Sequence, residues 1–501
     1  MEQQVTITLL PGHEQFDAPA GQVLLDALRR YGVPLDAPCG GKGTCGKCRV
    51  TANGREVPAC QYVLSEDVAV ELPEQARVRV LTGDSAAAAD GEHAYVLAVD
   101  IGTTTVAAFL SDGKTGRQLS CAGAVNPQSA YGADVIARIQ YELEHRDGKM
   151  ADEIRSCLHR LTLEAAGMAG IPADRIGLAV LVGNTAMHHL LLGLDTAPLV
   201  KPPYMPSVRG AMELHGADWL PIARDAVVRV LPNIAGFVGA DTVGCMVSAA
   251  FDRLEQLTLL IDIGTNGEMV LGDRSRRIAC STAAGPAFEG ARIRFGMRGA
   301  PGAIDHAVPA DGALDCHVIG GGEAKGICGS GLLDAVYALL RGGFVDASGR
   351  MCPEDVPGPW LTVDGQPAFL LRDGVYLTQK DIREVQLAKA AIRAGIELLL
   401  DTMGRERTDV REVLLAGAFG NYLSPESACG IGMLPPELLD RVRTIGNAAG
   451  EGAKQCALQM SDYRRSIALA EETEFLELAS LPAFQDCYVD CLSFGEEDED
   501  P

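Results

Sequence analysis

The sequence predicts a multidomain protein, with a small α+β domain at its N-terminus followed by a duplicated α/β architecture. The chain has 501 residues, whereas single hydrophobic cores stop growing at about 250 to 300 residues. A glycine-rich loop with three cysteines lies near the start, and two similar segments, around DIGTTT and DIGTNGE, lie further along. We predict these boundaries: domain 1–81, linker 82–94, first lobe 95–255, second lobe 256–495 and acidic tail 496–501.

The first domain has the pattern of a short sheet with one helix. Residues 4–10, QVTITLL, alternate like a strand, and residues 14–20, EQFDAPA, can return as a second strand. A helix is expected over 21–32, GQVLLDALRRYG, and further short strands are expected over 55–72. The small, polar stretch TGDSAAAADGEH then predicts a linker, so a new domain should begin at Tyr95.

Beyond the linker, buried strands alternate with helices. Residues 95–110, YVLAVDIGTTTVAAFL, contain an apolar run, a Gly/Thr turn and a second apolar run. Residues 257–271, LTLLIDIGTNGEMVL, repeat that arrangement, which indicates paired domains. A long helix is expected over 378–404, and a buried strand with a glycine turn over 410–423.

The composition excludes several classes of partner. The net charge of −24 disfavours contact with nucleic acid or anionic lipid. No apolar run reaches membrane-spanning length, and the N-terminus lacks a signal-peptide pattern, so we expect a cytoplasmic protein without membrane contact. In that compartment the fifteen cysteines should be reduced. We expect the eleven outside the loop, among them Cys245, Cys280, Cys316 and Cys429, to be buried small hydrophobes.

Four cysteines have the spacing of metal ligands: Cys39, Cys45, Cys48 and Cys60, in the pattern C-x5-C-x2-C-x11-C. Four thiolates can hold zinc or an iron–sulfur cluster, and a purely structural thiol cluster is a further alternative. The glycines between them favour a cluster, because they let backbone N–H groups approach its sulfides. The loop resembles that of [2Fe–2S] ferredoxins of the β-grasp fold, although the plant-type spacing is one residue shorter. That resemblance implies one iron on Cys39 and Cys45 and the other on Cys48 and Cys60.

The two DIG segments have the chemistry of phosphate binding. An Asp ends a strand, and the following turn offers backbone N–H groups and hydroxyls. Together with LLAGAFGNYL, residues 414–423, they resemble the phosphate and adenosine motifs of actin, sugar-kinase and Hsp70-type ATPases, which have a duplicated RNase H-like fold. The resemblance implies that Asp100 and Asp262 position Mg²⁺ or the attacking water. It implies ATP contacts from Gly102, Thr103, Thr104, Gly264, Thr265, Asn266, Gly267, Gly417 and Gly420.

Other residues are of interest in their local context. Glu289, in AAGPAFEGA, is a candidate for a lobe-interface or water-orienting role, with a solvated or capping carboxylate as the alternative. Ser330, in a glycine-flanked turn that opens a helix, is a candidate anion or nucleotide contact. Asn184 stands at a strand-to-helix turn, and a shared metal role for His188 and His189 is disfavoured, because adjacent helical residues point about 100° apart.

The whole chain resembles the reductive activators of corrinoid proteins. The segments that carry the resemblance are NPQSAYGADVIARI, VLVGNTAMHHLLLG, TAAGPAFEGA and KGICGSGLLDAV, beside the cysteine loop and the DIG motifs. The resemblance implies ATP-dependent transfer of one electron from the [2Fe–2S] cluster to Co(II), which regenerates Co(I) for methyl transfer. It also implies a corrinoid protein as acceptor and an external low-potential electron donor.

Two departures and three alternatives accompany this interpretation. A homodimer stays open, but the short linker leaves little room for an extra middle domain that some members carry. Cys487 and Cys491 alone do not supply the C-terminal [4Fe–4S] clusters of related activators. The alternatives are a small-molecule kinase with a fused redox regulator, a non-enzymatic ATP-dependent redox sensor and an activator of radical dehydratases.

Overall fold

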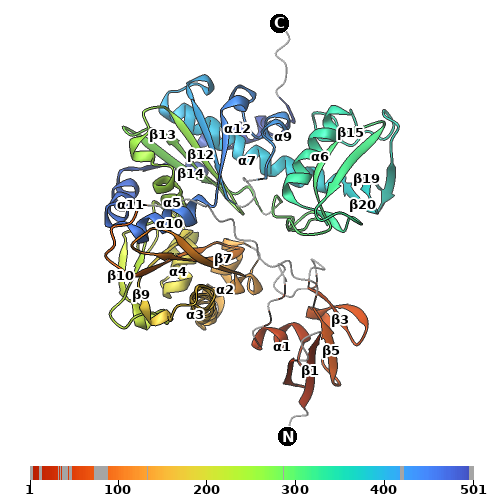
Figure 1. Ribbon diagram of the computed structural model, residues 1–501. Helices are drawn as coiled ribbons and strands as arrows, with labels where there is room; N and C mark the ends of the chain where they lie inside the picture. The colour runs from red at the N-terminus through yellow and green to blue at the C-terminus, as the bar shows by residue number, and fades with distance from the viewer. Residues whose placement is uncertain are drawn as a thin grey trace.

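The chain folds into an N-terminal domain and two lobes, each lobe built on a six-stranded sheet, with an insert in the second lobe (Figure 1). This arrangement confirms the predicted multidomain class. The computed structural model describes residues 4–10, 14–31, 33, 35, 43, 48–72, 88–132, 134–285, 287–417 and 422–495.

The N-terminal domain is a mixed five-stranded sheet with the order β2-β1-β5-β3-β4, packed on one helix. Buried and less buried residues alternate along β1, so one face of the sheet packs on the helix. The parallel β1–β5 pair between two antiparallel hairpins is the β-grasp arrangement predicted from the cysteine loop. The elements are β1 Gln4–Leu10, β2 Glu14–Pro19, α1 Leu24–Arg30, β3 Arg49–Ala52, β4 Arg55–Pro58 and β5 Val68–Glu71.

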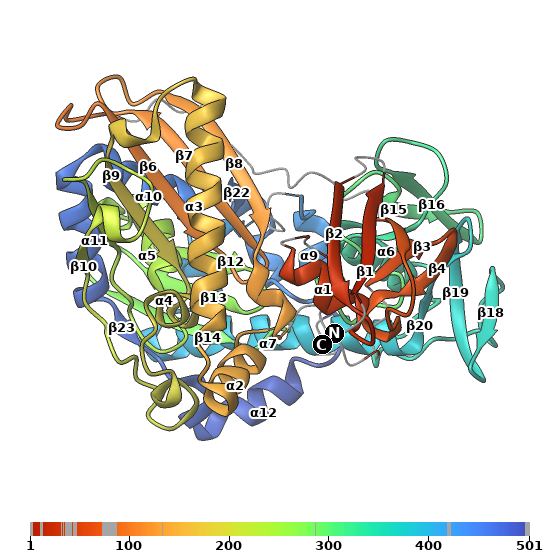
Figure 2. The ribbon, with the colours of Figure 1, turned by 90° about the horizontal axis from the view of Figure 1, so that it is seen from below.

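The first lobe has the strand order β10-β11-β9-β6-β7-β8. β6 is nearly continuously buried, as expected for a central strand covered on both faces. In Figure 2 the long helix α3 lies across the β7–β8 side of this sheet. The elements are β6 Tyr95–Ile101, β7 Thr105–Asp112, β8 Gln118–Val125, α2 Val135–His145, α3 Lys149–Ala169, β9 Ile176–Gly183, α4 Thr185–Leu192, β10 Met212–His215, β11 Val227–Val230 and α5 Ala240–Ser248.

The second lobe has the order β22-β21-β12-β13-β14-β23, in which the first five strands repeat the arrangement β11-β9-β6-β7-β8 of the first lobe. β12 occupies the place of β6, pairing antiparallel with β13 and parallel with β21, so the two DIG segments are structural equivalents. The elements are β12 Thr258–Ile263, β13 Gly267–Gly272, β14 Arg277–Thr282, α7 Gln379–Met403, β21 Glu412–Ala416, α9 Pro425–Gly430, β22 Val442–Gly446, α10 Ala448–Leu458, α11 Met460–Glu472, β23 Glu474–Phe475 and α12 Pro482–Asp490.

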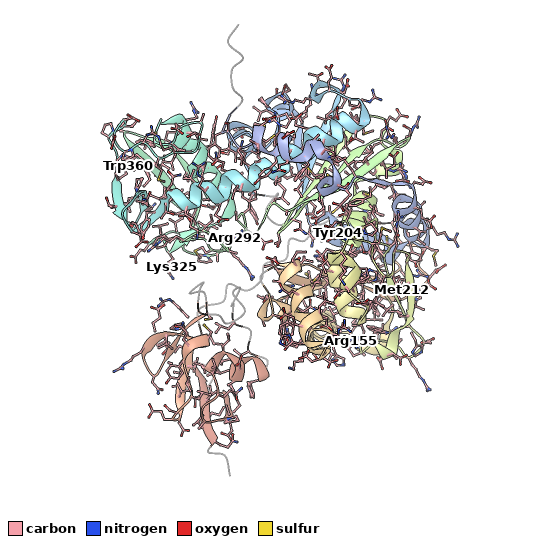
Figure 3. All side chains as sticks on the ribbon, turned by 180° about the vertical axis from the view of Figure 1, so that it is seen from behind. Arg155, Tyr204, Met212, Arg292, Lys325 and Trp360 are labelled. Carbon is pink, nitrogen blue, oxygen red and sulfur yellow. The ribbon has the colours of Figure 1, made fainter. Side chains whose placement is uncertain are left out.

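An insert between β14 and α7, absent from our predictions, contains two three-stranded sheets and helix α6. Trp360, marked at the outer edge of the insert in Figure 3, packs edge-on against Phe344 and Phe369. The insert therefore has its own aromatic cluster. Its elements are β15 Ala303–Ala310, β16 Ala313–Val318, β17 Gly326–Ile327, α6 Gly329–Arg341, β18 Trp360–Val363, β19 Gln366–Arg372 and β20 Val375–Thr378.

Helices α5 and α10 lie between the two sheets and share one hydrophobic cluster with both. They cross where Gly244 meets Gly452, and a Cβ on Gly452 would collide with the Gly244 carbonyl oxygen. A Cβ on Gly244 would lie 2.8 Å from the Ala449 carbonyl oxygen. Glycine is required here because the two helix backbones touch.

The second half of the predicted linker is bound to the second lobe's C-terminal helices. The Asp90 N–H donates to the Leu458 carbonyl at 3.0 Å, and the Asp90 carboxylate accepts from the Met460 N–H at 3.0 Å. The strand after it begins at Tyr95. No helix among the described residues is long and apolar enough to cross a membrane.

The expectation that all eleven cysteines outside the loop are buried is wrong for three of them. Cys121, Cys487 and Cys491 are partly exposed, whereas the others are buried. Cys487 and Cys491 lie at the C-terminal end of α12, a surface helix on which none of the described residues is buried. The sequence gives no sign that this last helix lies at the surface.

Candidate functional site

The first phosphate loop, at the end of β6, is held by bonds to its backbone carbonyls. The side-chain amide of Asn126 donates to the Gly102 carbonyl at 2.8 Å, and the backbone N–H of Asn126 donates to the Thr104 carbonyl at 2.9 Å. The guanidinium of Arg138 donates to the Thr103 carbonyl at 2.6 Å. With its three carbonyls bonded to the lobe, the loop is held in one conformation. Asn126 and Arg138 lie in the segment NPQSAYGADVIARI, which explains what that motif does.

Arg138 is a buried cation beneath this loop. Its guanidinium also donates to the Gly132 carbonyl at 3.0 Å. Burial lowers its pKa to about 10, while the nearby carboxylates of Glu289 and Asp134 act in the opposite direction. It therefore stays charged near neutral pH and adds positive potential at the phosphate loop.

Side-chain bonds tie this loop to its surroundings and to the other lobe. Asn184, the N-cap of α4, donates to the Thr103 hydroxyl at 2.8 Å. The Thr104 hydroxyl donates to Glu289 Oε2 at 2.8 Å, and the Thr265 hydroxyl donates to Glu289 Oε1 at 3.0 Å. Glu289 thus joins the first and second phosphate loops.

The second loop, at the end of β12, is a tight turn with a glycine packed over its Asp. The Gly264 N–H donates to the Asn266 carbonyl at 2.9 Å, and Gly267 opens β13. Gly417 has a φ of +89°, and a Cβ there would lie 2.7 Å from Asp262 Oδ1. The adenosine-type motif therefore begins against the Asp262 carboxylate, at a position that only glycine fits. Gly420 lies outside the described residues.

Four carboxylates gather near these loops, of which Glu268 is buried and the other three are partly buried. Asp100 and Asp262 are the penultimate residues of β6 and β12, and Glu268 is the cross-strand partner of Asp262. Burial raises the pKa of Asp100 to about 7 and that of Asp262 to about 6. Burial also raises the pKa values of Asp241, in the first turn of α5, and of Glu268, with repulsion from neighbouring carboxylates as the next cause. A cation bound among these carboxylates would favour their charged forms and lower the raised pKa values.

Four residues near these loops were not predicted as site residues: Asp241, Glu268, Asn447 and Cys245, the last expected only as a buried hydrophobe. Asn447, the N-cap of α10, hydrogen-bonds Asp100, which lowers the pKa of that carboxyl. Cys245 donates to Asp262 Oδ2 at 3.6 Å. The only sequence signals were an Asp in the first turn of the helix that follows NIAGFVG and the Glu that ends DIGTNGE. Within the described ranges, no group of three or more His, Cys, Asp or Glu is arranged to hold a metal ion.

Ser330 and the pair His188 and His189, which the sequence also singled out, hydrogen-bond to neighbouring groups of the protein. Ser330, buried in the first turn of α6, donates to the Asp305 carbonyl at 3.0 Å. His188 and His189 are both buried, and their ring nitrogens bond separately, to Asn233 at 2.6 Å and to the Thr185 carbonyl at 2.7 Å. The histidine pair is therefore part of the lobe's core.

The described part of the cysteine cluster lies at the base of the β3–β4 hairpin. Cys48 precedes β3, Cys60 follows β4, and the Ala59 N–H donates to the Cys48 carbonyl at 2.8 Å. Gly43 has a φ of +75°, and a Cβ there would collide with the Gln61 amide. Two thiols on adjacent hairpin ends, with a glycine of the loop packed beside them, fit a cluster ligand set. Cys39 and Cys45 lie outside the described residues.

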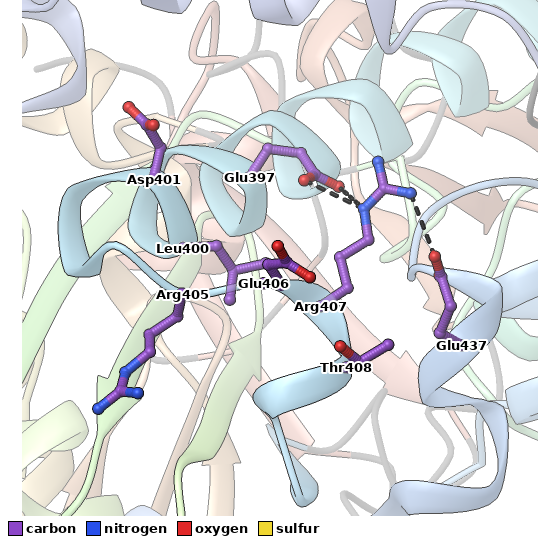
Figure 4. Close-up of a pocket in the computed structure, with 8 residues that line it drawn as sticks. All are labelled: Glu397, Leu400, Asp401, Arg405, Glu406, Arg407, Thr408 and Glu437. Atoms are coloured by element: carbon purple, nitrogen blue, oxygen red, sulfur yellow. Dashed lines mark hydrogen bonds and ion pairs between the residues drawn. The ribbon is translucent and has the colours of Figure 1, made fainter.

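A surface pocket of about 360 Å³ on the second lobe is separate from these sites (Figure 4). Within it, Arg407 bonds Glu397 at 3.0 Å and Glu437 at 3.4 Å. Arg407 is therefore held by two carboxylates of the pocket, and we assign this pocket no functional role. It is lined by Glu397, Leu400, Asp401, Arg405, Glu406, Arg407, Thr408 and Glu437, none of which is a predicted site residue.

The fold and these sites together define a ferredoxin-type iron–sulfur domain joined to a two-lobed ATPase of the actin and Hsp70 type. Three family models match in order. They are described as a 2Fe-2S iron-sulfur cluster binding domain (residues 7–76), the RACo middle region (95–254) and the C-terminal domain of RACo, the ASKHA domain (256–501). The RACo middle region matches residues 95–254, which nearly coincide with the segment predicted as the first lobe. This region is therefore found in the first lobe, and the short linker does not have to contain it.

Two known proteins align with nearly the whole of this chain, and a third aligns with about half of it. The corrinoid activation enzyme RamQ of Eubacterium limosum is 31% identical, over 96% of this chain and 98% of the relative. A solved structure described as a reductive activator for corrinoid, iron-sulfur protein matches with a TM-score of 0.74 and 26% identity, over 99% of each chain. The [Co(II) methylated amine-specific corrinoid protein] reductase of Methanosarcina barkeri is 29% identical, over 57% of this chain and 54% of the relative. The chain belongs to the family of corrinoid activation enzymes.

Proposed function

We propose that this protein is an ATP-dependent reductive activator of a corrinoid protein, returning Co(II) to Co(I) for methyl transfer. The observation that carries the proposal is the union, in one chain, of a ferredoxin-type domain and two facing phosphate loops. The relative named as a corrinoid activation enzyme aligns with nearly all of this chain.

The thiolates of Cys39, Cys45, Cys48 and Cys60 would hold the [2Fe–2S] cluster. When bound, the cluster supplies one electron at a time. The hairpin that places Cys48 beside Cys60 supports the pairing of these two on one iron. Cys48 is buried, so the thiolate that it would supply is shielded from solvent.

The nucleotide would lie between the two loops, with its phosphates on their N–H groups and hydroxyls. Asp100 and Asp262 would hold Mg²⁺ directly or through water, and Asp241 and Glu268 add negative charge there. Glu289, which bonds both loops, would position them and so set the separation of the lobes. Further contacts would come from Gly102, Thr103, Thr104, Gly264, Thr265, Asn266, Gly267, Ser330, Gly417 and Gly420.

ATP is needed because the electron transfer is uphill. If the acceptor lies ~0.1 to 0.2 V below the donor, each electron costs about 2 to 5 kcal/mol. Binding of the corrinoid protein would alter the axial ligation of cobalt and raise its potential, and ATP hydrolysis would then reset or release the complex. A bound partner shifts such an equilibrium only by its differential affinity for the two states.

The proposal includes two further partners, an electron donor and a second copy of this chain. An external low-potential electron donor would reduce the iron–sulfur domain. A homodimer stays a prediction, which sedimentation of the intact protein would test.

The test is anaerobic mixing of chemically reduced protein with a Co(II) corrinoid protein, with and without Mg-ATP. The visible absorbance of Co(I) should appear only with ATP. Cys45→Ser should abolish it, whereas the matched control Cys121→Ser, at a partly exposed thiol far along the chain, should not. Asp262→Asn should abolish the formation of Co(I) in the presence of ATP. It should leave the visible spectrum of the iron–sulfur domain intact. Failure of several corrinoid partners to yield Co(I) would count against the proposal.

A further inference from the structure

Two histidines face each other on the β15–β16 hairpin of the insert. His306 on β15 and His317 on β16 are cross-strand partners, and their ring centroids are 6.5 Å apart. Their side chains are 56% and 66% exposed. They line an open pocket of about 350 Å³ together with Asp315 and Arg372. Both rings can therefore be reached from solvent.

A carboxylate fixes the orientation of each ring. His306 Nδ1 lies 2.9 Å from Asp334 Oδ2, and His317 Nδ1 lies 2.6 Å from Asp305 Oδ1. An ionised carboxylate can only accept a hydrogen bond, so each Nδ1 carries the proton. In the neutral imidazole, Nε2 then keeps its lone pair. Metal-ligating histidines almost always donate their other ring N–H to a carboxylate, a backbone carbonyl or a water, and both histidines here have a carboxylate in that place.

The Asp334 carboxylate is itself held in place. It is buried, and its second oxygen accepts a hydrogen bond from the Ser427 hydroxyl at 2.6 Å. Ser427 and His306 each bond the carboxylate and not each other, so the three residues cannot act as a serine nucleophile with its base. The arrangement serves to orient His306.

We propose that His306 and His317 bind one divalent transition-metal ion of the zinc, nickel or copper type through their Nε2 atoms. Imidazole is the ligand that these ions share. Two imidazoles on one tetrahedral ion have ring centroids ~5 Å apart, given metal–nitrogen distances of about 2.0 to 2.1 Å. The rings must therefore approach by ~1.5 Å, which their exposure permits.

The remaining ligands are water, which makes this an open site. In the described part of the chain the two histidines do not belong to a group of three or more His, Cys, Asp or Glu residues arranged to hold a metal ion. Arg372 brings positive charge to the pocket wall, but it bonds the Asp373 carboxylate at 3.3 Å and the Cys316 carbonyl at 2.8 Å. Its charge is thereby partly balanced and its position fixed. This inference does not depend on the proposed corrinoid activity.

The experiment is an anaerobic calorimetric titration of the intact protein, with its iron–sulfur cluster loaded, with Ni²⁺. The unaltered protein should bind one Ni²⁺ per chain. The His306→Ala and His317→Ala variants should each fail to bind it. The control His159→Ala, at an exposed histidine on α3, should bind as the unaltered protein does. Asp305→Ala, which removes the hydrogen-bond partner of His317, should weaken binding about 10- to 100-fold.

A second measurement guards against misfolding of the variants. Ni²⁺ should raise the thermal unfolding temperature of the unaltered protein and of His159→Ala, and leave that of the His306→Ala/His317→Ala double variant unchanged. Equal Ni²⁺ uptake by the double variant and the unaltered protein would overturn the proposal, as would an absence of uptake by the unaltered protein.

Discussion

The Thr104 hydroxyl donates a hydrogen bond of 2.8 Å to Glu289, 185 positions further along the chain and in the other lobe. The second oxygen of the same carboxylate accepts from Thr265 at 3.0 Å. One side chain therefore couples the two phosphate loops. Because any nucleotide bound by both loops must lie next to these hydroxyls, Glu289 is placed to link nucleotide contacts with the relative position of the lobes.

Replacing Glu289 with Ala should destabilise the two-lobed part of the protein by about 1 to 3 kcal/mol, because two hydrogen bonds to a charged group are lost. A double-mutant cycle with Thr104→Val should give an interaction energy of about 0.5 to 3 kcal/mol. Denaturant unfolding measures both. The control Glu164→Ala, at a surface carboxylate on α3, should change stability by less than about 0.5 kcal/mol. Strict additivity of the two substitutions would show that the Glu289–Thr104 bond contributes nothing.

The crossing of α5 and α10 predicts that Gly452, between the lobes, does not tolerate a larger side chain. Gly452→Ala would put a Cβ onto the Gly244 carbonyl, so the two helices must separate. We expect a loss of about 1 to 3 kcal/mol, visible as a lower unfolding temperature.

The matched control is Gly167→Ala, inside the exposed face of α3. A Cβ there meets nothing within 4 Å, so the higher helix propensity of Ala should raise stability by about 1 kcal/mol. If both substitutions changed stability by the same amount and sign, the close approach at Gly452 would have no energetic importance.

The duplicated lobes could be predicted because their signals are local. Residues 95–110 and 257–271 each hold two buried strands and one turn, so apolar runs and glycines are sufficient. The phosphate-loop motifs lie within these same short stretches. The insert escaped prediction because its short strands are divided between two small sheets that meet only in the folded chain.

The supporting residues of the site were missed for a different reason. Asn447 reaches Asp100 from a helix at the far end of the chain, and Asp241 approaches from α5. Only the pseudo-symmetric packing of the two lobes brings these segments together. No spacing in the sequence records that packing, so Asn447 and Asp241 were not predicted as site residues.

The carboxylates near the phosphate loops predict a dependence of stability on pH. Burial raises the pKa of Asp100 from 3.8 to about 7, so between these values the folded state binds more protons than the unfolded state. Its contribution to stability is therefore fully present below about pH 4 and is lost as the pH rises toward 7. Mg²⁺ requires the deprotonated form, so its affinity should rise over the same window.

Thermal unfolding at pH 6 and pH 8, with and without Mg²⁺, measures this effect. The stabilisation by Mg²⁺ should be larger at pH 8. Asp100→Asn should flatten the pH dependence of the metal-free protein, whereas Asp218→Asn, at an exposed carboxylate, should not. Equal stabilisation by Mg²⁺ at both pH values would contradict the assignment of these carboxylates to the cation.

Arg138 should be irreplaceable even by lysine. Its guanidinium donates in two directions at once, to the Gly132 and Thr103 carbonyls, and a lysine ammonium cannot match that fork from the same backbone position. Arg138→Lys keeps the charge but frees the first phosphate loop. We therefore expect the affinity for ATP to fall by about tenfold or more, since one lost charged hydrogen bond costs about 1.5 to 3 kcal/mol. Titration with a fluorescent ATP analogue measures the loss. Arg160→Lys, at an exposed arginine on α3, should bind normally, and unchanged affinity in Arg138→Lys would show that the charge alone supports the loop.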